Sequence, residues 1–415
     1  MDTVAHRRLV GGILAGVAGV AVVLIAPVVA QDWPQWRGPN RDGAMASFSR
    51  PASWPERLAR QWQVEVGLGY ASPLVVGTRL YLFTRQGEEE VMQAMDASSG
   101  KVIWRTSYPA PFEMNSSTAR HRAGPKSTPA FANGRLFTLG MSSIVTAFDA
   151  ATGRRLWQKP ATKAQPLFHT AMSPLVDGDR VIIHVGGPGD TALTAFDVAT
   201  GAERWRWSGD SPAYGSPIAV DLAGTRQIVT FTHQNLVGVS AATGALLWSR
   251  PFKTPADTTS QTPILYRDML IQAGRENGFV AFRVVRQEGG FATKDVWRTD
   301  QVSQHMTNGV AIDSVLYGLS HRNSGQYFAL DLDTGKVLWT SEPRQAENVG
   351  FVRAGDTIFA LEDDGEMVIM NASRVGFNPV RRYELGASET WTQPTISGNR
   401  VYVKDVSHLT LWTLN

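Results

Sequence analysis

The chain has 415 residues, of which 43% are hydrophobic and 19% are charged, a composition typical of soluble globular proteins. The formal net charge is only +3, which argues against nucleic acid as a partner, because nucleic-acid-binding proteins concentrate basic charge on one surface. Cysteine is absent, so stability has to come from core packing rather than disulfides, and a lipid anchor on cysteine is not expected.

The first predicted element is a secretory signal peptide over residues 1–30. A basic start (residues 6–8) precedes an apolar run (residues 9–26), and Val28 and Ala30 occupy the small-residue positions of a cleavage site. We therefore expect a periplasmic or secreted protein that is cleaved near Ala30. An uncleaved anchor is the alternative, since about 18 apolar residues can just span a bilayer, and it would be the only membrane attachment.

Residues 31–59 follow as a segment rich in Pro, Arg and Trp that lacks the periodicity of a helix or strand. We expect this segment to be an extension that packs across one face of the domain formed by residues 60–415. It is not expected to contribute a repeat unit to that domain.

Residues 60–415 repeat one motif. Near-copies of AFDAATGRRLW occur at 94–104, 147–157, 195–205, 238–248 and 329–339. Degenerate copies end at Trp297 and Tyr383, and an eighth unit begins near residue 390 but lacks a last strand. The stretch RQWQVEV at 60–66 has the Trp and the alternation of that missing strand. The sequence therefore predicts eight units in a closed ring.

Each unit is predicted to contain four strands separated by turn signals, and a four-stranded repeat of about 40–50 residues is typical of a propeller blade. The predicted fold is all-β: an eight-bladed β-propeller of four-stranded antiparallel blades, closed by an N-terminal strand that completes the last blade. Within the motif, Asp149 can accept turn N–H groups, Gly153 suits a left-handed turn position, and Trp157 can wedge against the neighbouring blade and bond its backbone.

The motif A-x-D-x-x-T-G-x-x-x-W is similar to the tryptophan-docking motif of the pyrroloquinoline-quinone (PQQ) type β-propeller repeats, in the quinoprotein alcohol dehydrogenase-like superfamily. The resemblance covers about residues 60–415 and implies an eight-bladed propeller. One branch of the family binds PQQ and calcium in the central funnel and oxidises alcohols or sugars. Another includes the propeller lipoprotein of the outer-membrane barrel-assembly machinery, which binds proteins without a cofactor.

The sequence departs from both branches. It lacks the adjacent cysteine pair of many dehydrogenases, is shorter than they are, and offers no motif that matches their calcium ligands; it also lacks a lipidated cysteine. Because fold does not fix function, we expect a monomeric, non-catalytic binding scaffold in the cell envelope with a protein or polysaccharide-type partner and without cofactor or metal. The alternative is a small quinoprotein oxidoreductase that uses PQQ and calcium.

A binding site is predicted at one mouth of the central channel, where the innermost strands begin. Eight positions just before these strands form a polar and aromatic collar: Tyr70, Lys126, Ala171, Tyr214, Ser260, Thr307, Asn348 and Trp391. The two longest inter-blade loops, 109–127 and 159–172, open on the same face and add further basic groups. These are Arg120, His121, Arg122, Lys163 and His169, with His305 nearby before the sixth inner strand.

This basic surface leads to the hypothesis of an anion-accepting or acidic-partner site over the first three blades. A PQQ-like tricarboxylate or an acidic peptide would suit it, and a merely solvated basic loop is the alternative. His121, His169 and His305 come from distant segments without metal-ligand spacing, so no metal site is predicted. Glu389 beside Trp391 could serve as a general base, but a solvated carboxylate explains it equally.

Overall fold

The computed structural model describes Met1 and residues 32–414 apart from residues 47 and 49. The predicted signal peptide lies outside the described residues from residue 2 onward. Among the described helices, none has the length and apolar character needed to cross a bilayer.

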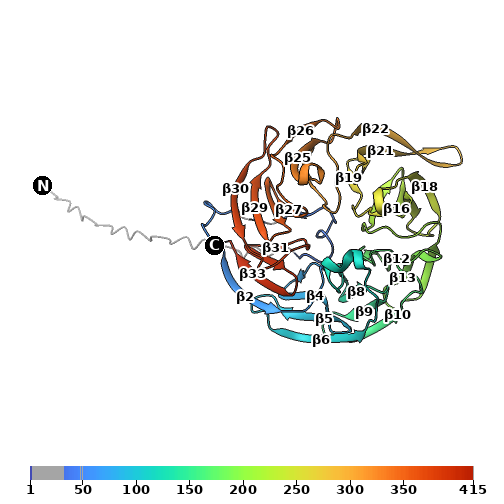
Figure 1. The fold of residues 1–415 in the computed structure, drawn as a ribbon, viewed down its shortest axis with the longest axis horizontal. Helices are drawn as coiled ribbons and strands as arrows, with labels where there is room; N and C mark the ends of the chain where they lie inside the picture. The colour runs from blue at the N-terminus through green and yellow to red at the C-terminus, as the bar shows by residue number, and fades with distance from the viewer. Residues whose placement is uncertain (2–31, 47, 49, 415) are drawn as a thin grey trace.

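The described strands form eight antiparallel sheets arranged as the blades of a ring (Figure 1). The first four blades follow one another along the chain. Their strands, from the channel outward, are β3 (Leu74–Val76), β4 (Arg79–Gln86), β5 (Glu89–Asp96) and β6 (Val102–Pro109); β7 (Ala130–Ala132), β8 (Arg135–Leu139), β9 (Val145–Asp149) and β10 (Arg155–Lys159); β11 (Leu175–Asp177), β12 (Arg180–Gly187), β13 (Asp190–Asp197) and β14 (Glu203–Trp207); β15 (Ile218–Leu222), β16 (Thr225–Phe231), β17 (Asn235–Ser240) and β18 (Leu246–Pro251).

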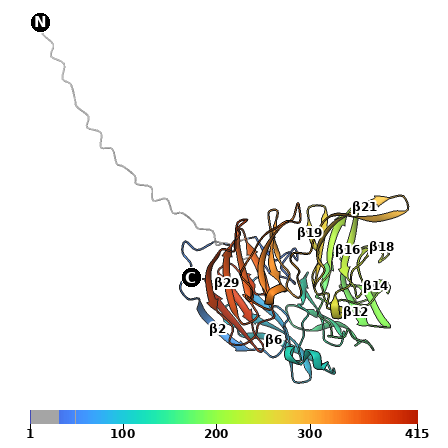
Figure 2. The ribbon, with the colours of Figure 1, turned by 45° about the horizontal axis from the view of Figure 1, so that its top comes forward.

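Blades 5 to 8 continue the ring. Their strands are β19 (Ile264–Tyr266), β20 (Met269–Gly274), β21 (Gly278–Gln287) and β22 (Gly290–Thr299); β23 (Val310–Ile312), β24 (Val315–Ser320), β25 (Gln326–Asp331) and β26 (Val337–Thr340); β27 (Val349–Ala354), β28 (Thr357–Glu362), β29 (Glu366–Asn371) and β30 (Pro379–Glu384); β31 (Thr395–Ser397), β32 (Arg400–Lys404), β33 (His408–Thr413) and β2 (Ala59–Glu65). The hairpin between β21 and β22 projects beyond the rim (Figure 2). The short helices are η1 (Ser116–His121), η2 (Pro255–Asp257) and η3 (Arg322–Ser324).

The ring closes as the sequence predicts, because β2 pairs antiparallel with β33 as the outer strand of blade 8. Trp62 lies opposite Leu411, and Ala59 lies opposite Thr413. The first long strand and the last strand thus share one sheet, which removes the free edges that an open ring would leave. The prediction of an eight-bladed, all-β propeller is confirmed.

In five blades the repeated Trp bonds the next blade. Trp104 donates from Nε1 to the carbonyl oxygen of Ala150 at 3.1 Å, and its ring occupies the space where a Cβ on Gly153 would lie, 2.4 Å from the Trp104 Cε3 atom. Four other indoles also donate to a carbonyl of the following blade: Trp157, Trp205, Trp297 and Trp339. Trp248 differs, because it bonds Gln227 of its own blade at 2.6 Å.

A second set of bonds links the blades around the channel. In four blades the hydroxyl before the inner-strand proline accepts from a backbone N–H of the adjacent blade: Ser216 accepts from Ser173, Ser173 from Thr128, Thr128 from Ser72, and Ser72 from Gln393. The Ser-Pro and Thr-Pro signatures therefore fasten neighbouring inner strands together. These bonds set the spacing of the inner strands at the mouth of the channel where those strands begin. We call this mouth the upper mouth.

The opposite, lower mouth is crossed by residues 32–45, which we call the N-terminal plug. Trp33 pairs antiparallel with Val75 of blade 1, and β1 (Ala44–Met45) pairs parallel with β27 of blade 7. The side chain of Trp33 is buried, with 1% of its surface exposed. The plug thus packs against the inner strands inside the ring and adds no blade (Figure 1).

Candidate functional site

At the upper mouth, the structure brings four of the predicted site residues together. The His121 ring lies edge-on to Trp391, with centroids 4.6 Å apart, and edge-on to Tyr70 at 6.1 Å. The Arg120 guanidinium lies over the Trp391 ring at 5.4 Å. Burial raises the pKa of Tyr70 to about 12, and it lowers the pKa of His121, with smaller contributions from Lys126 and Arg120. The cluster is therefore an aromatic contact centred on Trp391 with a neutral imidazole.

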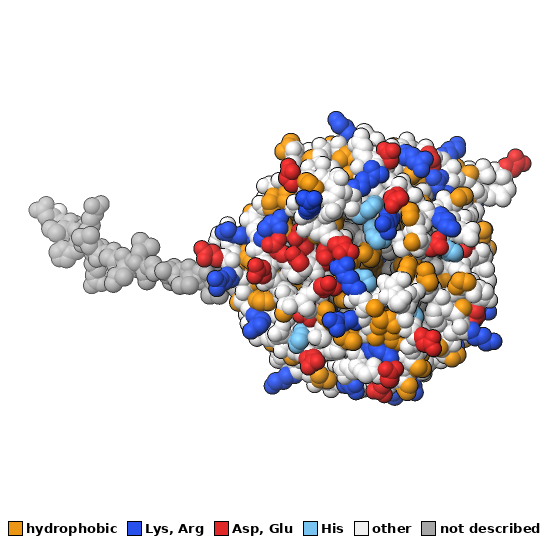
Figure 3. Space-filling view, in the orientation of Figure 1, with side chains coloured by type: hydrophobic (Ala, Val, Ile, Leu, Met, Phe, Trp, Pro, Cys, Tyr) orange, Lys and Arg blue, Asp and Glu red, His pale blue; other side chains and the backbone are white. Residues whose placement is uncertain are grey.

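Arg120 also joins the loop 109–127 to the connections that precede blades 7 and 8. It forms ion pairs with Glu347 at 3.0 Å and with Glu389 at 3.6 Å. These carboxylates precede the inner strands of blades 7 and 8, whereas η1 belongs to the connection between blades 1 and 2. Acidic and basic side chains consequently lie side by side near the central hollow of this face (Figure 3). The loop closes over the mouth and holds its arginine against two carboxylates.

A second group lies over blades 2 to 4. Lys126 donates from Nζ to the carbonyl oxygen of Phe168 at 3.0 Å, and the N–H of Phe168 donates to the Tyr214 hydroxyl at 3.2 Å. Burial lowers the pKa of Lys126 to about 8. His169 is 8% exposed and packs edge-on against Phe112; burial, and then Lys126, lower its pKa. Near neutral pH the charge of this group is therefore carried mainly by Lys126.

The remaining predicted residues lie apart from these groups. The Asn348 Oδ1 accepts a hydrogen bond from Thr307 at 3.1 Å, which ties blade 7 to blade 6. His305 lies 6.1 Å from His321, and burial lowers its pKa to about 4. Arg122 is exposed. His121, His169 and His305 therefore have different neighbours, and no group of three His, Cys, Asp or Glu side chains able to hold a metal occurs among the described residues.

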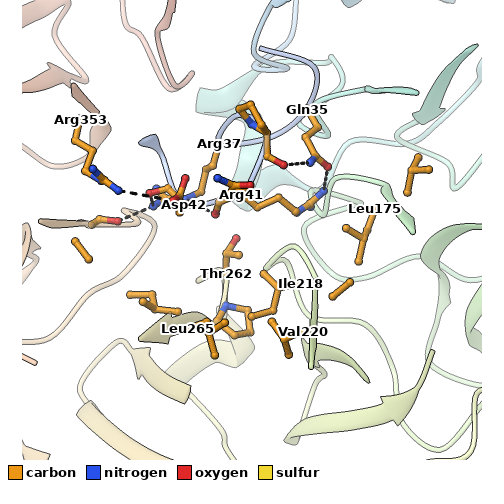
Figure 4. Close-up of a pocket in the computed structure, with 18 of the residues that line it drawn as sticks. Gln35, Arg37, Arg41, Asp42, Leu175, Ile218, Val220, Thr262, Leu265 and Arg353 are labelled. Carbon is orange, nitrogen blue, oxygen red and sulfur yellow. Dashed lines mark hydrogen bonds and ion pairs between the residues drawn. The ribbon is translucent and has the colours of Figure 1, made fainter. Parts of the chain in front are cut away.

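The lower mouth contains a cavity of about 570 Å³ between the N-terminal plug and blades 3 to 6. Inner-strand side chains such as Ile218 and Leu265 form its apolar wall, and arginines of the plug form the opposite wall (Figure 4). Its volume lies in the range of ligand sites, which is about 300–1,000 Å³. Residues 31–59 were expected only to pack on the ring, so the sequence did not point to this cavity.

Two buried arginines hold the plug in place beside the cavity. Arg37 donates to the carbonyl oxygens of Asn308 and Gly309, at 2.9 and 2.6 Å. Arg41 donates to the carbonyl oxygen of Pro174 at 2.9 Å. Burial lowers their pKa values, to about 10 for Arg37 and about 9 for Arg41. Both remain cationic at neutral pH, so the plug brings positive charge to the lower mouth.

Comparison with known proteins gives the family. A family model described as "Outer membrane protein assembly factor BamB" and named PQQ_2 matches residues 87–341. The chain belongs to this PQQ_2 family. The resemblance inferred from the repeated Trp motif is thereby confirmed.

Individual PQQ_2-like relatives are distant. An outer membrane protein assembly factor BamB from Yersinia pestis is 23% identical over 327 residues, which cover 75% of this chain and 70% of that protein. A polyvinylalcohol dehydrogenase from Sphingopyxis is 30% identical over 234 residues, covering 50% of this chain and 32% of that protein. The crystal structure of BamB from Moraxella catarrhalis matches with a TM-score of 0.62 and 17% identity, over 86% of this chain and 97% of that one, which shows the fold alone.

The residues at the upper mouth of this PQQ_2 member do not fit a quinone with calcium. Trp391, the aromatic ring available for stacking, is already covered by Arg120 and His121. The carboxylates of Glu347 and Glu389 are engaged by the same arginine, whereas Ca²⁺ needs six to eight oxygen ligands. The described residues of this mouth therefore offer no carboxylate set for metal-assisted oxidation.

Proposed function

We propose that this PQQ_2-family propeller is a non-catalytic binding scaffold of the cell envelope that docks a protein partner on its upper face. The observation that carries the proposal is the double ion pair of Arg120 with Glu347 and Glu389, which folds the loop 109–127 over the channel mouth. A cofactor in the channel would compete with this loop, whereas a partner on the outer surface would not. The scaffold needs no cofactor or metal and acts as a monomer.

Exposed apolar side chains support docking on this face. Met114 is 38% exposed and Leu167 is 60% exposed, and the Asn115 side chain bonds the Leu167 carbonyl at 3.0 Å, so the two loops present one surface. Apolar side chains beside basic ones are typical of protein-docking surfaces. Together with the exposed Arg122, this surface favours a partner that carries acidic and apolar groups.

The proposed location is the periplasm or the secreted fraction, after cleavage of the signal peptide near Ala30. The basic start and apolar run of residues 1–30 support this proposal. Mass spectrometry of the exported protein would give its N-terminus, and a chain that begins before residue 9 would favour the uncleaved anchor.

Site-specific photo-crosslinking in cells tests the docking surface. A benzophenone amino acid replaces Leu167 on the upper face, and in a control strain it replaces Val375, which is 94% exposed on another part of the ring. We expect a discrete crosslinked protein from position 167 and none from position 375. Equal crosslinking from both positions, or none from either, would contradict a partner site on the upper face.

A quinoprotein oxidoreductase is the second candidate, favoured by the 30% identity to a polyvinylalcohol dehydrogenase over half of the chain. Titration of the chain with PQQ, with and without calcium, followed by dye reduction on alcohols and sugars, separates the two functions. Calcium-dependent binding with turnover would establish the enzyme. Absence of PQQ binding would contradict the enzyme and leave the binding scaffold as the function.

A further inference from the structure

The N-terminal plug binds the inner strands at one repeated position. It bonds the backbone of Val75 in blade 1, Phe131 in blade 2 and Arg353 in blade 7. Each of these residues is the second from the hairpin turn of its inner strand and lies opposite Leu80, Leu136 or Ile358, respectively. The plug therefore forms hydrogen bonds with the same inner-strand position in three different blades.

This position is available because of the hydrogen-bond pattern of the ladder. In an antiparallel pair, residues alternate between pairs that exchange N–H···O bonds and pairs whose polar groups point away from the partner strand. Val75 belongs to the second kind, and both its N–H and its C=O bond Trp33, at 3.2 and 2.7 Å. The channel-facing edge of an inner strand can therefore form backbone hydrogen bonds with an extended chain.

The cavity at the lower mouth contains the same position in the blades that the plug leaves open. In blades 3, 5 and 6 the equivalent residues are Val176, Leu265 and Ala311, which lie opposite Val181, Leu270 and Leu316. In blade 4 the inner strand is longer, and Ala219, opposite Ile228, lies two residues further from the turn on the same edge. All four line the cavity. Leu265 is 43% exposed, so an apolar side chain and a backbone edge face the same space.

The charge around the cavity favours an acidic occupant. Four arginines line it, together with Asp42 and Asp313. Arg353 pairs with Asp42, and Arg226 pairs with Asp177 and Asp221, so the excess positive charge comes from Arg37 and Arg41 of the plug. Arg41 is 5% exposed, and its Nε atom has no hydrogen-bond partner among the described residues. A buried donor left unpaired costs free energy.

We propose that the lower-mouth cavity binds an extended acidic peptide segment of a partner protein. The peptide adds as a strand to the inner edges of blades 3 to 6, in the way that the N-terminal plug adds to blades 1, 2 and 7. Backbone hydrogen bonds supply affinity, as in other cases of strand addition, and the arginine wall and Leu265 select acidic and apolar side chains. The site goes beyond the proposed function, because it lies at the mouth opposite the loop 109–127.

Fluorescence anisotropy with three labelled hexapeptides tests the proposal on the chain that starts at residue 31. The first probe is acetyl-Glu-Val-Thr-Val-Glu-Val. In the second, Lys replaces both Glu residues, and in the third, alternate backbone nitrogens are methylated. We expect saturable binding of the first probe only, because the second reverses the charge and the third loses the donors needed for strand addition.

The matched protein variants are Leu265→Glu and Leu246→Glu. Leu265 lies in the cavity, whereas Leu246 is 47% exposed on an outer strand, so the same charge is added to two exposed strand positions. Leu265→Glu should weaken the binding of the acidic probe about tenfold, and Leu246→Glu should leave that binding unchanged.

The proposal is overturned if the acidic probe does not bind, if binding survives methylation or charge reversal of the probe, or if the two variants change the affinity equally. Crosslinking at residue 167 reports on the opposite mouth, so the two tests fail independently.

Discussion

The guanidinium of Arg37 donates a hydrogen bond of 2.6 Å to the carbonyl oxygen of Gly309, although 272 residues separate them in the chain. Arg37 is 4% exposed, and it bonds the Asn308 carbonyl as well. Two buried hydrogen bonds therefore tie the N-terminal plug to the inner edge of blade 6.

Arg37→Ala is expected to lower the free energy of unfolding by about 3 kcal/mol, because two buried carbonyl oxygens lose their donor. Urea unfolding monitored by circular dichroism measures this loss. Arg60→Ala, at an exposed position of β2, is the control and should change stability by less than about 0.5 kcal/mol. Equal stability of the two variants would show that the plug does not support the ring.

Gly153→Ala tests the stacking of Trp104 on the following blade. Gly153 has φ +75° and its added Cβ would meet the Trp104 ring, whereas Gly134 has φ +72° with open space around its Cβ position. Gly134→Ala should cost about 1 kcal/mol for the left-handed backbone alone. Gly153→Ala should cost about 2 kcal/mol more, from displacement of the indole. Thermal unfolding compares them, and similar losses would exclude a role for the ring contact.

Glu362 should make stability depend on pH. It is 2% exposed, and burial raises its pKa from 4.5 to about 7, opposed by the hydrogen bond from Tyr327. Because the folded state favours the protonated carboxyl, its contribution is full below pH 4.5 and is lost as the pH rises through 7. Glu362→Gln should therefore be more stable than the parent at pH 8, by up to about 3 kcal/mol, and similar to it at pH 4.5.

Urea unfolding at the two pH values measures this difference. Glu384→Gln, at an exposed position of the same blade, should show no pH-dependent gain. A constant difference between the Glu362→Gln variant and the parent would mean that the carboxyl is charged throughout this range.

Arg120→Ala should release the loop 109–127 from Glu347 and Glu389 at the upper mouth. Each exposed ion pair contributes about 0.2–1 kcal/mol, so hydrogen exchange in residues 116–121 should accelerate about three- to tenfold. Arg122→Ala, at the exposed neighbouring position, should leave the exchange unchanged. Salt should accelerate exchange in the parent and not in the Arg120→Ala variant. If the variant exchanges at the same rate as the parent, the Arg120 ion pairs do not hold the loop.

The sequence predicted the features that recur with the repeat. The spacing of the Trp residues gives the number of blades, and the isolated strand at 60–66 gives the closure, because both depend on alternation and turns that are local. The ion pairs of Arg120 could not be predicted from the sequence for a non-local reason. Arg120 is visible as a basic loop residue, but its partners Glu347 and Glu389 lie in loops more than 220 residues away.

The N-terminal plug could not be predicted in detail for the same reason. Arg37 and Arg41 have left-handed backbones, with φ of 59° and 58°, and such irregular segments carry no periodic signal. Their partners are backbone carbonyls, which every residue has, so no complementary residue type marks the contact in the sequence. The lower-mouth cavity depends on this placement and was missed with it.

The contacts of the plug also impose an order on folding. Residues 32–45 leave the ribosome before any blade, yet Arg41 needs blade 3, Arg37 needs blade 6 and β1 needs blade 7. The plug is synthesised before any blade and completes its contacts only after blade 7 has been made. Until blade 7 exists, the lower mouth of the growing ring stays open.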